Sequence, residues 1–257
     1  MFKILAIGDV CGPCGLEHIK VNLWRVRREM KINMVVINGE NVAEPNGIDR
    51  TSALALFESG ADVITTGNHI WRKSCVHSFL DDCDALLRPL NFPKTNPGHG
   101  SCIVKIDGYR VLCMNVMGSA YMDASACPFE SVEACLKHNE GLYDFALLDI
   151  HAEATGEKKA LAYYFSRHLS ACFGTHTHVQ TNDACILDGR CGYITDLGMV
   201  GALDSILGVK KECVIHRLKT KMLSRFDFAQ GEAQADGAVF EIDENSGKCV
   251  SVKTVRF

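Results

Sequence analysis

Two histidines, His176 and His178, are the residues of this chain whose spacing first suggests chemistry. They lie one residue apart, directly after the apolar run Ser170–Phe173, which has the length and composition of a buried strand. In an extended backbone, residues i and i+2 point to the same side. A continuing strand would therefore aim both imidazoles into one pocket and turn Thr175 and Thr177 away. A His-x-His pair alone is at least as common in an ordinary surface or core, so its meaning depends on the residues that accompany it.

Four other predicted strands also end in side chains that can bind metals. The first three strands, near residues 3–8, 34–38 and 62–66, alternate with helical patterns near 15–30 and 51–59, as the βαβ units of a parallel sheet do. In such sheets the ligand crevice lies at the carboxyl ends of the strands. We therefore expect a metal site at that edge. The metal-capable side chains that follow the four strands are, in chain order, Asp9, then Glu40 and Asn41, then Asn68 and His69, and then His151.

The candidate ligands are carboxylates, amides and imidazoles, with no thiolate among them. Mixed nitrogen and oxygen ligands favour manganese, iron or zinc over a structural cysteine-type zinc site. Six or seven ligands exceed what one tetrahedral ion needs, whereas two ions that share a carboxylate would use them all. Two metals ~3.5–4 Å apart form the arrangement that hydrolyses phosphoesters. The ligand set therefore indicates a dinuclear site.

The rest of the chain predicts a mixed sheet. Alternating segments that flank short turns predict three β-hairpins, at Ser101–Ile106 with Tyr109–Asn115, at Ala184–Leu187 with Tyr193–Thr195, and at Gly237–Ile242 with Lys248–Arg256. Helices are expected near 130–138 and at Thr155–Ser166. The predicted fold class is α/β, with two packed mixed β-sheets flanked by helices. We expect one domain over residues 1–257, because a boundary would split the candidate ligands. Gly198–Gly208 is expected to be a glycine-punctuated loop that could cover the pocket.

Composition narrows the class of protein. The chain has 257 residues, of which 47% are hydrophobic and 23% charged, and its net charge is -4. Such a chain carries no electrostatic footprint for duplex nucleic acid. No apolar run approaches the ~20 residues that cross a bilayer, and Phe2–Ile7 is too short for a signal peptide. The 13 cysteines lack a framework spacing, so we expect reduced thiols in a cytoplasmic protein that is not bound to a membrane. The oligomeric state stays open, a homo-oligomer included.

The motifs around these residues resemble a known family. Gly8-Asp9, Asn38–Asn41, Gly67–His69, His151 and Gly174–His178 resemble the successive motifs of the calcineurin-like metallophosphoesterases. Longer blocks resemble, more narrowly, the YmdB-like branch of that superfamily, in order and over nearly the whole chain. These blocks are Ile37–Ala43, Thr66–Trp71, Leu87–Pro89, Asp149–Thr155, Thr175–Thr181 and Tyr193–Met199.

The resemblance implies an α/β/β/α sandwich and an enzyme that hydrolyses small phosphodiesters, with 2′,3′-cyclic nucleotides as the substrate type. It implies two divalent or trivalent metal ions, iron or manganese, and in-line attack on phosphorus by a hydroxide held between them. One ion would take Asp9, Glu40, Asn41 and His178, and the other would take Glu40, Asn68, His151 and His176. Glu40 would bridge the ions, and His69 would be catalytic, as the general acid for the leaving oxygen.

Two alternative functions remain open. Cys11-Gly-Pro-Cys14 matches the thioredoxin redox motif and lies between a predicted strand and a predicted helix, where a helix N-terminus lowers a thiol pKa. No aromatic residue precedes the motif, however, and no thioredoxin-like remainder follows it. The second alternative is a metal-binding regulatory protein of the same fold with little turnover. The complete ligand set argues against that class.

Overall fold

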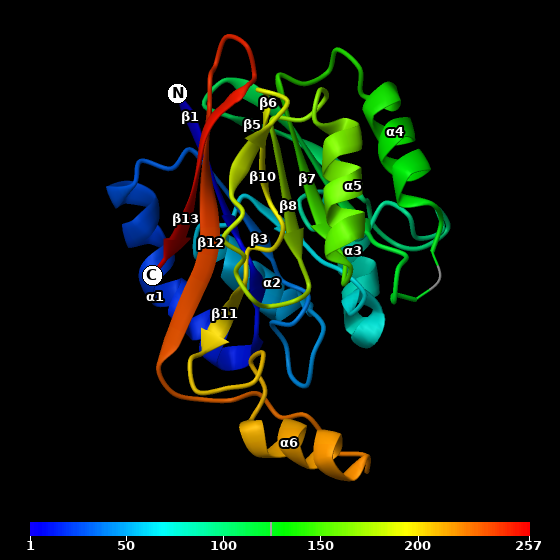
Figure 1. The fold of residues 1–257 in the computed structure, drawn as a ribbon, viewed down its shortest axis with the longest axis vertical. Helices are drawn as coiled ribbons and strands as arrows, with labels where there is room; N and C mark the ends of the chain where they lie inside the picture. Colours follow the sequence, from blue (N-terminus) through cyan, green and yellow to red (C-terminus); the bar gives the residue numbers. More distant parts are fainter. Residues whose placement is uncertain (124) are drawn as a thin grey trace.

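The structure, a computed structural model, describes residues 1–123 and 125–257 and contains two β-sheets with helices outside them (Figure 1). A seven-stranded sheet has the order β2-β11-β12-β1-β3-β4, with β13 paired to β12, and a six-stranded sheet has the order β5-β6-β7-β8-β10-β9. The first sheet contains β1 (Phe2–Ile7), β2 (Asp9–Val10), β3 (Met34–Asn38), β4 (Val63–Thr65), β11 (Met199–Ala202), β12 (Ala233–Ile242) and β13 (Cys249–Arg256). The second contains β5 (Ser101–Ile106), β6 (Tyr109–Met117), β7 (Phe145–His151), β8 (Ala171–Thr175), β9 (Cys185–Leu187) and β10 (Cys191–Ile194).

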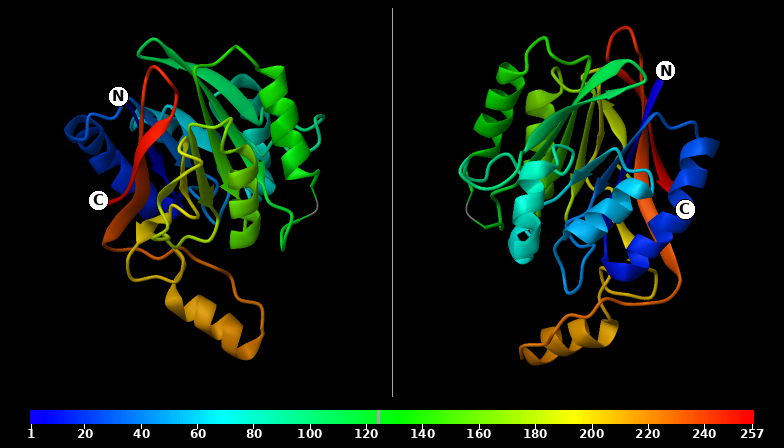
Figure 2. Two further views of the ribbon diagram at one scale, coloured as in Figure 1. Left: turned by 45° about the horizontal axis from the view of Figure 1, so that its top comes forward. Right: turned by 180° about the vertical axis from the view of Figure 1, so that it is seen from behind.

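Six α-helices occur in the described chain, five of them on the body. They are α1 (Gly12–Glu29), α2 (Arg50–Glu58), α3 (His77–Asp82), α4 (Pro128–His138), α5 (Thr155–Phe165) and α6 (Lys211–Thr220). Two short 3₁₀ turns, Ile70–Arg72 and Ser74–Val76, precede α3. Figure 2 shows α1 on one side of the paired sheets and α4 and α5 on the other. The observed layering confirms the predicted fold class.

The alternation of side chains along β1 shows how the layers form. Leu5 and Ile7 belong to one buried cluster with Leu23 of α1, whereas Ile4 belongs to a second cluster with Phe173 of the other sheet. Successive residues of a strand point to opposite faces, so one strand packs against a helix and against a sheet at once. A third cluster joins the outer face of the six-stranded sheet to α4 and α5. Apolar burial at roughly 25 cal/mol per Å² makes these three layers the main stabilising term.

The strand pairings largely match the predictions. β1, β3 and β4 are parallel neighbours, as the βαβ pattern predicted, and the three predicted hairpins are antiparallel pairs. The prediction of a loop over Gly198–Gly208 was wrong in its first half. Met199–Ala202 forms β11, which pairs with β12 and with the short strand β2. The pairing partners are far away in sequence, so the glycine pattern alone gave no sign of them.

The segment between β11 and β12 leaves the body of the molecule. We call residues 203–232 the arm; it carries α6, which projects beyond the sheets in Figures 1 and 2. None of the residues of α6 is buried. Among the described residues, no helix is both long and apolar enough to cross a membrane.

Candidate metal centre

The seven predicted ligands lie together at the carboxyl ends of strands from both sheets. The seven-stranded sheet positions Asp9 in β2, Glu40 and Asn41 after β3, and Asn68 after β4, while the six-stranded sheet positions His151 at the end of β7 and His176 and His178 after β8. Asp9, Glu40, Asn41 and His151 are buried, and the other three are half-buried. The strand ends that the sequence singled out therefore do converge.

One group of four residues surrounds a common point. His151 Nε2 lies 3.1 Å from His176 Nδ1, 3.0 Å from Asn68 Oδ1 and 3.3 Å from Glu40 Oε1. The ligand atoms of the histidines and the carboxylate all lie within 4.8 Å of one another. Two imidazoles, a carboxylate and an amide in this arrangement offer the mixed nitrogen and oxygen donors that manganese, iron and zinc accept.

The second group shares Glu40 with the first. His178 Nε2 lies 3.6 Å from Asp9 Oδ1 and 3.3 Å from Asn41 Nδ2, and that amide nitrogen lies 3.2 Å from Glu40 Oε1. An amide binds a cation through its oxygen, and here Asn41 Oδ1 faces His69 instead. Because the two ends of an amide are nearly isosteric, half a turn of the side chain would present the oxygen to the group.

One buried oxygen of Asp9 tests whether these residues fit a metal ion. Asp9 Oδ2 accepts a hydrogen bond of 3.1 Å from the His176 backbone N–H, but Oδ1 is buried without a hydrogen-bond partner in the described chain. An unpaired buried carboxylate oxygen is costly. A cation between Asp9 and His178 would satisfy it, so the residues present fit a metal ion.

His151 is oriented by a buried relay. Its Nδ1 lies 2.9 Å from Thr175 Oγ1, which donates a 2.8 Å hydrogen bond to Asp149 Oδ1, and Asp149 Oδ2 accepts from Thr65 Oγ1 and Asn38 Nδ2. Burial raises the pKa of Asp149 to about 6, against the hydrogen bond from Thr65 and the charge of His151. Such outer partners hold a ligating imidazole in one orientation.

His176 and His178 also contact hydrogen-bond partners outside the centre. His178 Nδ1 lies 3.0 Å from the Leu207 carbonyl oxygen, which can only accept a hydrogen bond, so Nε2 is the nitrogen that faces Asp9 in the centre. His176 Nε2 lies 3.2 Å from Glu153 Oε2, while its Nδ1 faces the first group. Each histidine therefore presents one nitrogen to the centre and the other to an acceptor outside it.

The electrostatics also suit a cation. Burial by itself would raise the pKa of Glu40, but the imidazoles of His151 and His69 outweigh it and hold that pKa well below its usual range. Burial and the neighbouring His151 lower the pKa of His176 to about 4. His176 beside ionised Glu40 thus has the neutral form that metal binding requires. Against the effect of burial, the carboxylates of Glu40 and Asp9 raise the pKa of His151, so a cation at the centre would displace the proton from that ring.

The backbone that carries His176 and His178 differs from the sequence prediction. β8 ends at Thr175, and the φ angles of His176 and His178 are +96° and +62°. Both histidines adopt left-handed conformations that cost non-glycine residues energy, so the prediction of an extended i, i+2 pair was wrong. They face one centre because the turn is held in this shape.

A buried ion pair holds that turn. Asp196 Oδ2 accepts hydrogen bonds from the Thr177 N–H at 3.1 Å and from its hydroxyl at 2.7 Å. The same oxygen lies 2.7 Å from Lys158 Nζ of α5, and both charged side chains are buried. Thr177 is thus tied to Asp196 by an anchor that the sequence pattern did not reveal.

Gly67 makes room for His151. A Cβ at Gly67 would lie 2.1 Å from His151 Cδ2 and 2.2 Å from Nε2. Such distances are far inside van der Waals contact. The chain before Asn68 can therefore approach the imidazole only because residue 67 has no side chain.

His69, the predicted general acid, lies beside both groups. Its Nδ1 is 2.8 Å from Asn41 Oδ1 and 3.2 Å from Glu40 Oε1, and its side chain lines the cavity above the centre. Because Nδ1 is directed at these acceptors, Nε2 is the nitrogen left to exchange a proton with a substrate.

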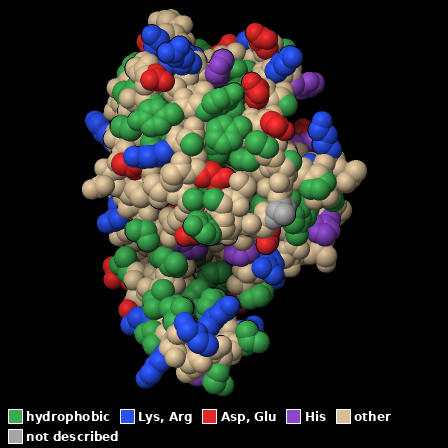
Figure 3. Space-filling view, turned by 45° about the vertical axis from the view of Figure 1, so that its right-hand side comes forward, with side chains coloured by type: hydrophobic (Ala, Val, Ile, Leu, Met, Phe, Trp, Pro, Cys, Tyr) green, Lys and Arg blue, Asp and Glu red, His purple; other side chains and the backbone are tan. Residues whose placement is uncertain are grey.

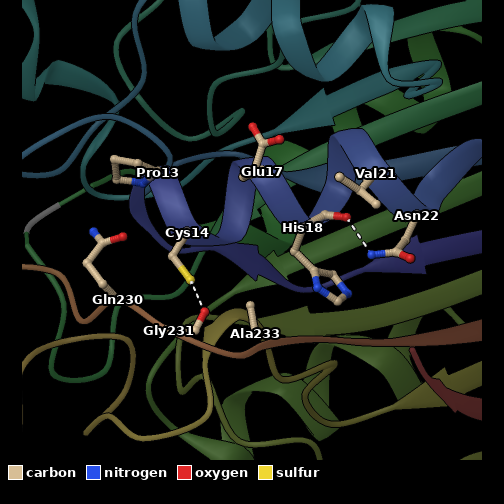
Figure 4. A pocket seen from close by; sticks show the side chains of 9 residues that line it. All are labelled: Pro13, Cys14, Glu17, His18, Val21, Asn22, Gln230, Gly231 and Ala233. Atoms are coloured by element: carbon tan, nitrogen blue, oxygen red, sulfur yellow. Dashed lines mark hydrogen bonds between the residues drawn. The ribbon is translucent and has the colours of Figure 1, made fainter.

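The two cysteines of the Cys-Gly-Pro-Cys motif are buried and point in different directions. Cys11 Sγ lies 3.6 Å from His178 Nδ1, whereas Cys14 Sγ donates to the Gly231 carbonyl at 3.3 Å, in a groove between α1 and the end of the arm (Figure 4). A redox dithiol needs an accessible thiol. This arrangement disfavours thiol exchange.

A cavity of about 370 Å³ opens over the centre. His69, His176, His178 and Glu40 line its floor, and one wall comes from the arm. Figure 3 shows histidine side chains where the body meets the arm, with hydrophobic side chains gathered below them. The expectation that Gly198–Gly208 could cover the pocket agrees with Leu207, which lines the cavity. The rest of the wall, and the Lys158–Asp196 anchor, were not predicted, because neither lies in a strand-end motif. Asp149 could have been noticed, since it lies two residues before His151.

Comparison with known proteins identifies the family. The family model described as YmdB-like protein matches residues 5–255. The chain belongs to the YmdB-like family. It is 39% identical over 253 residues to a Bacillus subtilis protein named 2′,3′-cyclic-nucleotide 2′-phosphodiesterase, in a match that covers 98% of this chain and 96% of that relative. The resemblance seen in the motifs is thereby confirmed.

Several solved structures share the fold. A hypothetical protein from Thermus thermophilus superposes with a TM-score of 0.94 at 36% identity, over 100% of this chain and 99% of that one. A structure named as a novel phosphatase from Mycoplasma pneumoniae gives 0.93 at 29% identity, over 100% and 93%. A 5′-nucleotidase precursor from Thermus thermophilus superposes with a TM-score of 0.60 at 12% identity, over 100% of this chain and 54% of that one. At this identity the similarity concerns only the fold.

Proposed function

We propose that this protein is a dinuclear metal-dependent phosphodiesterase that hydrolyses cyclic nucleotides, most favourably the 2′,3′-cyclic type. The observation that carries the proposal is the pair of ligand groups that share Glu40, together with the orphaned Oδ1 of buried Asp9. The Bacillus subtilis relative, named as a 2′,3′-cyclic-nucleotide 2′-phosphodiesterase, supports the substrate class.

The proposed ligands divide as the family resemblance implied. Glu40, Asn68, His151 and His176 would hold one ion, and Asp9, Glu40, Asn41 and His178 the other. Iron or manganese suits these donors. When bound, the two cations would activate water as the nucleophile and offset the charge that develops on phosphorus. Because the ligands come from both sheets, we infer that residues 1–257 act as one domain.

The protein's own side chains supply the rest of the chemistry. His69 would bind the leaving oxygen and donate the proton from Nε2, while Glu40 holds its Nδ1. Thr175 and Asp149 keep the His151 ring aimed at the centre. The walls of the cavity limit water around the reacting group, which strengthens these interactions. A cytoplasmic location stays a prediction.

The test combines metal analysis with turnover. Protein purified without chelator should contain about two iron or manganese ions per chain and should hydrolyse 2′,3′-cAMP faster than 3′,5′-cAMP. Glu40→Gln should lose both ions and the activity, whereas Glu133→Gln, an exposed matched control on α4, should lose neither. Preference for 3′,5′-cAMP would overturn the substrate class alone.

Each alternative function has a distinct outcome. A fully metallated protein that turns over no phosphodiester would favour the regulatory protein. Insulin reduction by the wild type that a Cys11→Ser/Cys14→Ser variant loses would establish thiol redox chemistry instead.

A further inference from the structure

The wall that the arm contributes to the cavity has no part in the proposed metal centre. It is apolar and aromatic, while the floor of the same cavity is polar. Its side chains are Leu207, Val209, Phe226 and Phe228. A cavity with one apolar wall beside a polar centre suits a ligand that has a flat apolar part and a charged part.

The wall is fixed relative to the centre at two points. Phe228 is 8% exposed and packs against Gly12 so closely that a Cβ at residue 12 would lie 2.5 Å from the ring. Val209 forms a β-bridge to Phe228. The Leu207 carbonyl lies 3.0 Å from His178 Nδ1. The arm therefore holds a predetermined position over the proposed ligands, although α6 itself projects from the body.

Phe226 provides the open aromatic surface. Phe226 lines the cavity and is 36% exposed overall, and the Arg217 guanidinium carbon lies 4.9 Å from the ring centroid. A cation over an aromatic ring stabilises the arrangement of the pair. Arg217 of α6 thus contacts the ring of Phe226, and Phe226 lines the cavity.

We propose that the arm forms a nucleobase subsite, in which the base stacks on Phe226 and contacts Phe228 and Val209 while its phosphodiester lies at the centre. This inference rests on the proposed function. Stacking on an aromatic ring accepts every base, because every base has a π-face. The side chains of the wall carry no donor or acceptor that could read a base edge. Stacking on this wall therefore does not distinguish one base from another, and the four bases should stack on it with similar strength.

The experiment compares two substrates with the same reacting group. 2′,3′-cAMP and glycerol 1,2-cyclic phosphate both contain a five-membered cyclic phosphodiester, but only the first has a base. Phe226→Ala should lower kcat/KM for 2′,3′-cAMP by about 5- to 100-fold, the loss of one base–aromatic stack. It should leave kcat/KM for glycerol cyclic phosphate unchanged, and Phe226→Trp should retain activity on both.

The matched control is Leu223→Ala, on the same arm, outside the cavity and 93% exposed. Leu223→Ala should leave kcat/KM unchanged for both substrates. An equal loss on both substrates in Phe226→Ala, or no loss on 2′,3′-cAMP, would overturn the subsite. Thermal unfolding of each variant shows whether the arm variant remains folded.

Equilibrium binding separates this inference from the proposed function. Calorimetry on the purified protein should show that adenosine 3′-monophosphate binds more tightly than glycerol phosphate, and that Phe226→Ala abolishes the difference. Base-dependent binding without turnover would refute the phosphodiesterase and support the subsite. Turnover of 2′,3′-cAMP with equal binding of the two phosphates would refute the subsite alone.

Discussion

Replacing Gly67 with alanine should disable the proposed centre without removing a ligand. The new Cβ would lie 2.1 Å from His151 Cδ2, and ordinary contact begins at 3.4 Å. The ring or the chain before Asn68 must therefore move by about 1.3 Å, since two carbon atoms cannot overlap so far. His151 cannot retreat freely, because Thr175 holds Nδ1 at 2.9 Å.

The size of the effect follows from that displacement. A shift of about 1 Å at a reacting centre costs roughly 100-fold in rate, and a disturbed ligand orientation costs roughly 10- to 100-fold in metal affinity. We therefore expect kcat/KM on bis-p-nitrophenyl phosphate to fall at least about 100-fold. Elemental analysis after dialysis against limiting manganese should show loss of the ion that His151 would share with Asn68.

A matched glycine gives the control. Gly156 lies in α5, and a Cβ there would meet nothing within 4 Å, so Gly156→Ala should keep activity and raise stability by up to about 1 kcal/mol. If Gly67→Ala kept both ions and wild-type kcat/KM, the position of His151 would not matter to the centre. The steric argument and the proposed role of His151 would then both be refuted.

Three further predictions concern the other histidines and their supports. His176→Ala and His178→Ala should each leave about one bound ion, at different positions in anomalous difference maps, because the two rings belong to different ligand groups. Thr175→Val should lower metal affinity roughly 10- to 100-fold, measured by competition with a chelator, since the hydroxyl that fixes the buried imidazole is lost. Lys158→Met should destabilise the fold by about 3–5 kcal/mol in denaturant unfolding, because Asp196 is left as a buried unpaired charge.

Each of these three predictions has its own contradicting result. Loss of the same ion from both histidine variants would contradict the assignment of the ligands. The control for Thr175→Val is Thr254→Val, at an exposed position of β13. If Thr175→Val kept the same metal affinity as this control, the hydroxyl of Thr175 would not position the His151 ring. A stability loss in Lys158→Met no larger than in exposed Lys159→Met would mean that the ion pair does not hold the turn.

The sequence alone predicted which residues are available at the site. Strand positions follow from the spacing of apolar side chains, and the residue after each strand is a local property of the chain. Asp9, Glu40, Asn68 and His151 could be placed at strand ends because both signals are read within a few residues. The family resemblance then divided the ligands into two groups that share Glu40, and the structure brings each group together.

The tertiary structure decided how those residues are oriented. His176 and His178 reach the centre through left-handed backbone held by Asp196 and Lys158, residues that local periodicity does not connect to them. The aromatic wall of the arm likewise depends on how residues 203–232 fold back over strand ends far away in the chain. A pattern records which side chain follows a strand, whereas its direction depends on contacts between distant segments that only packing creates.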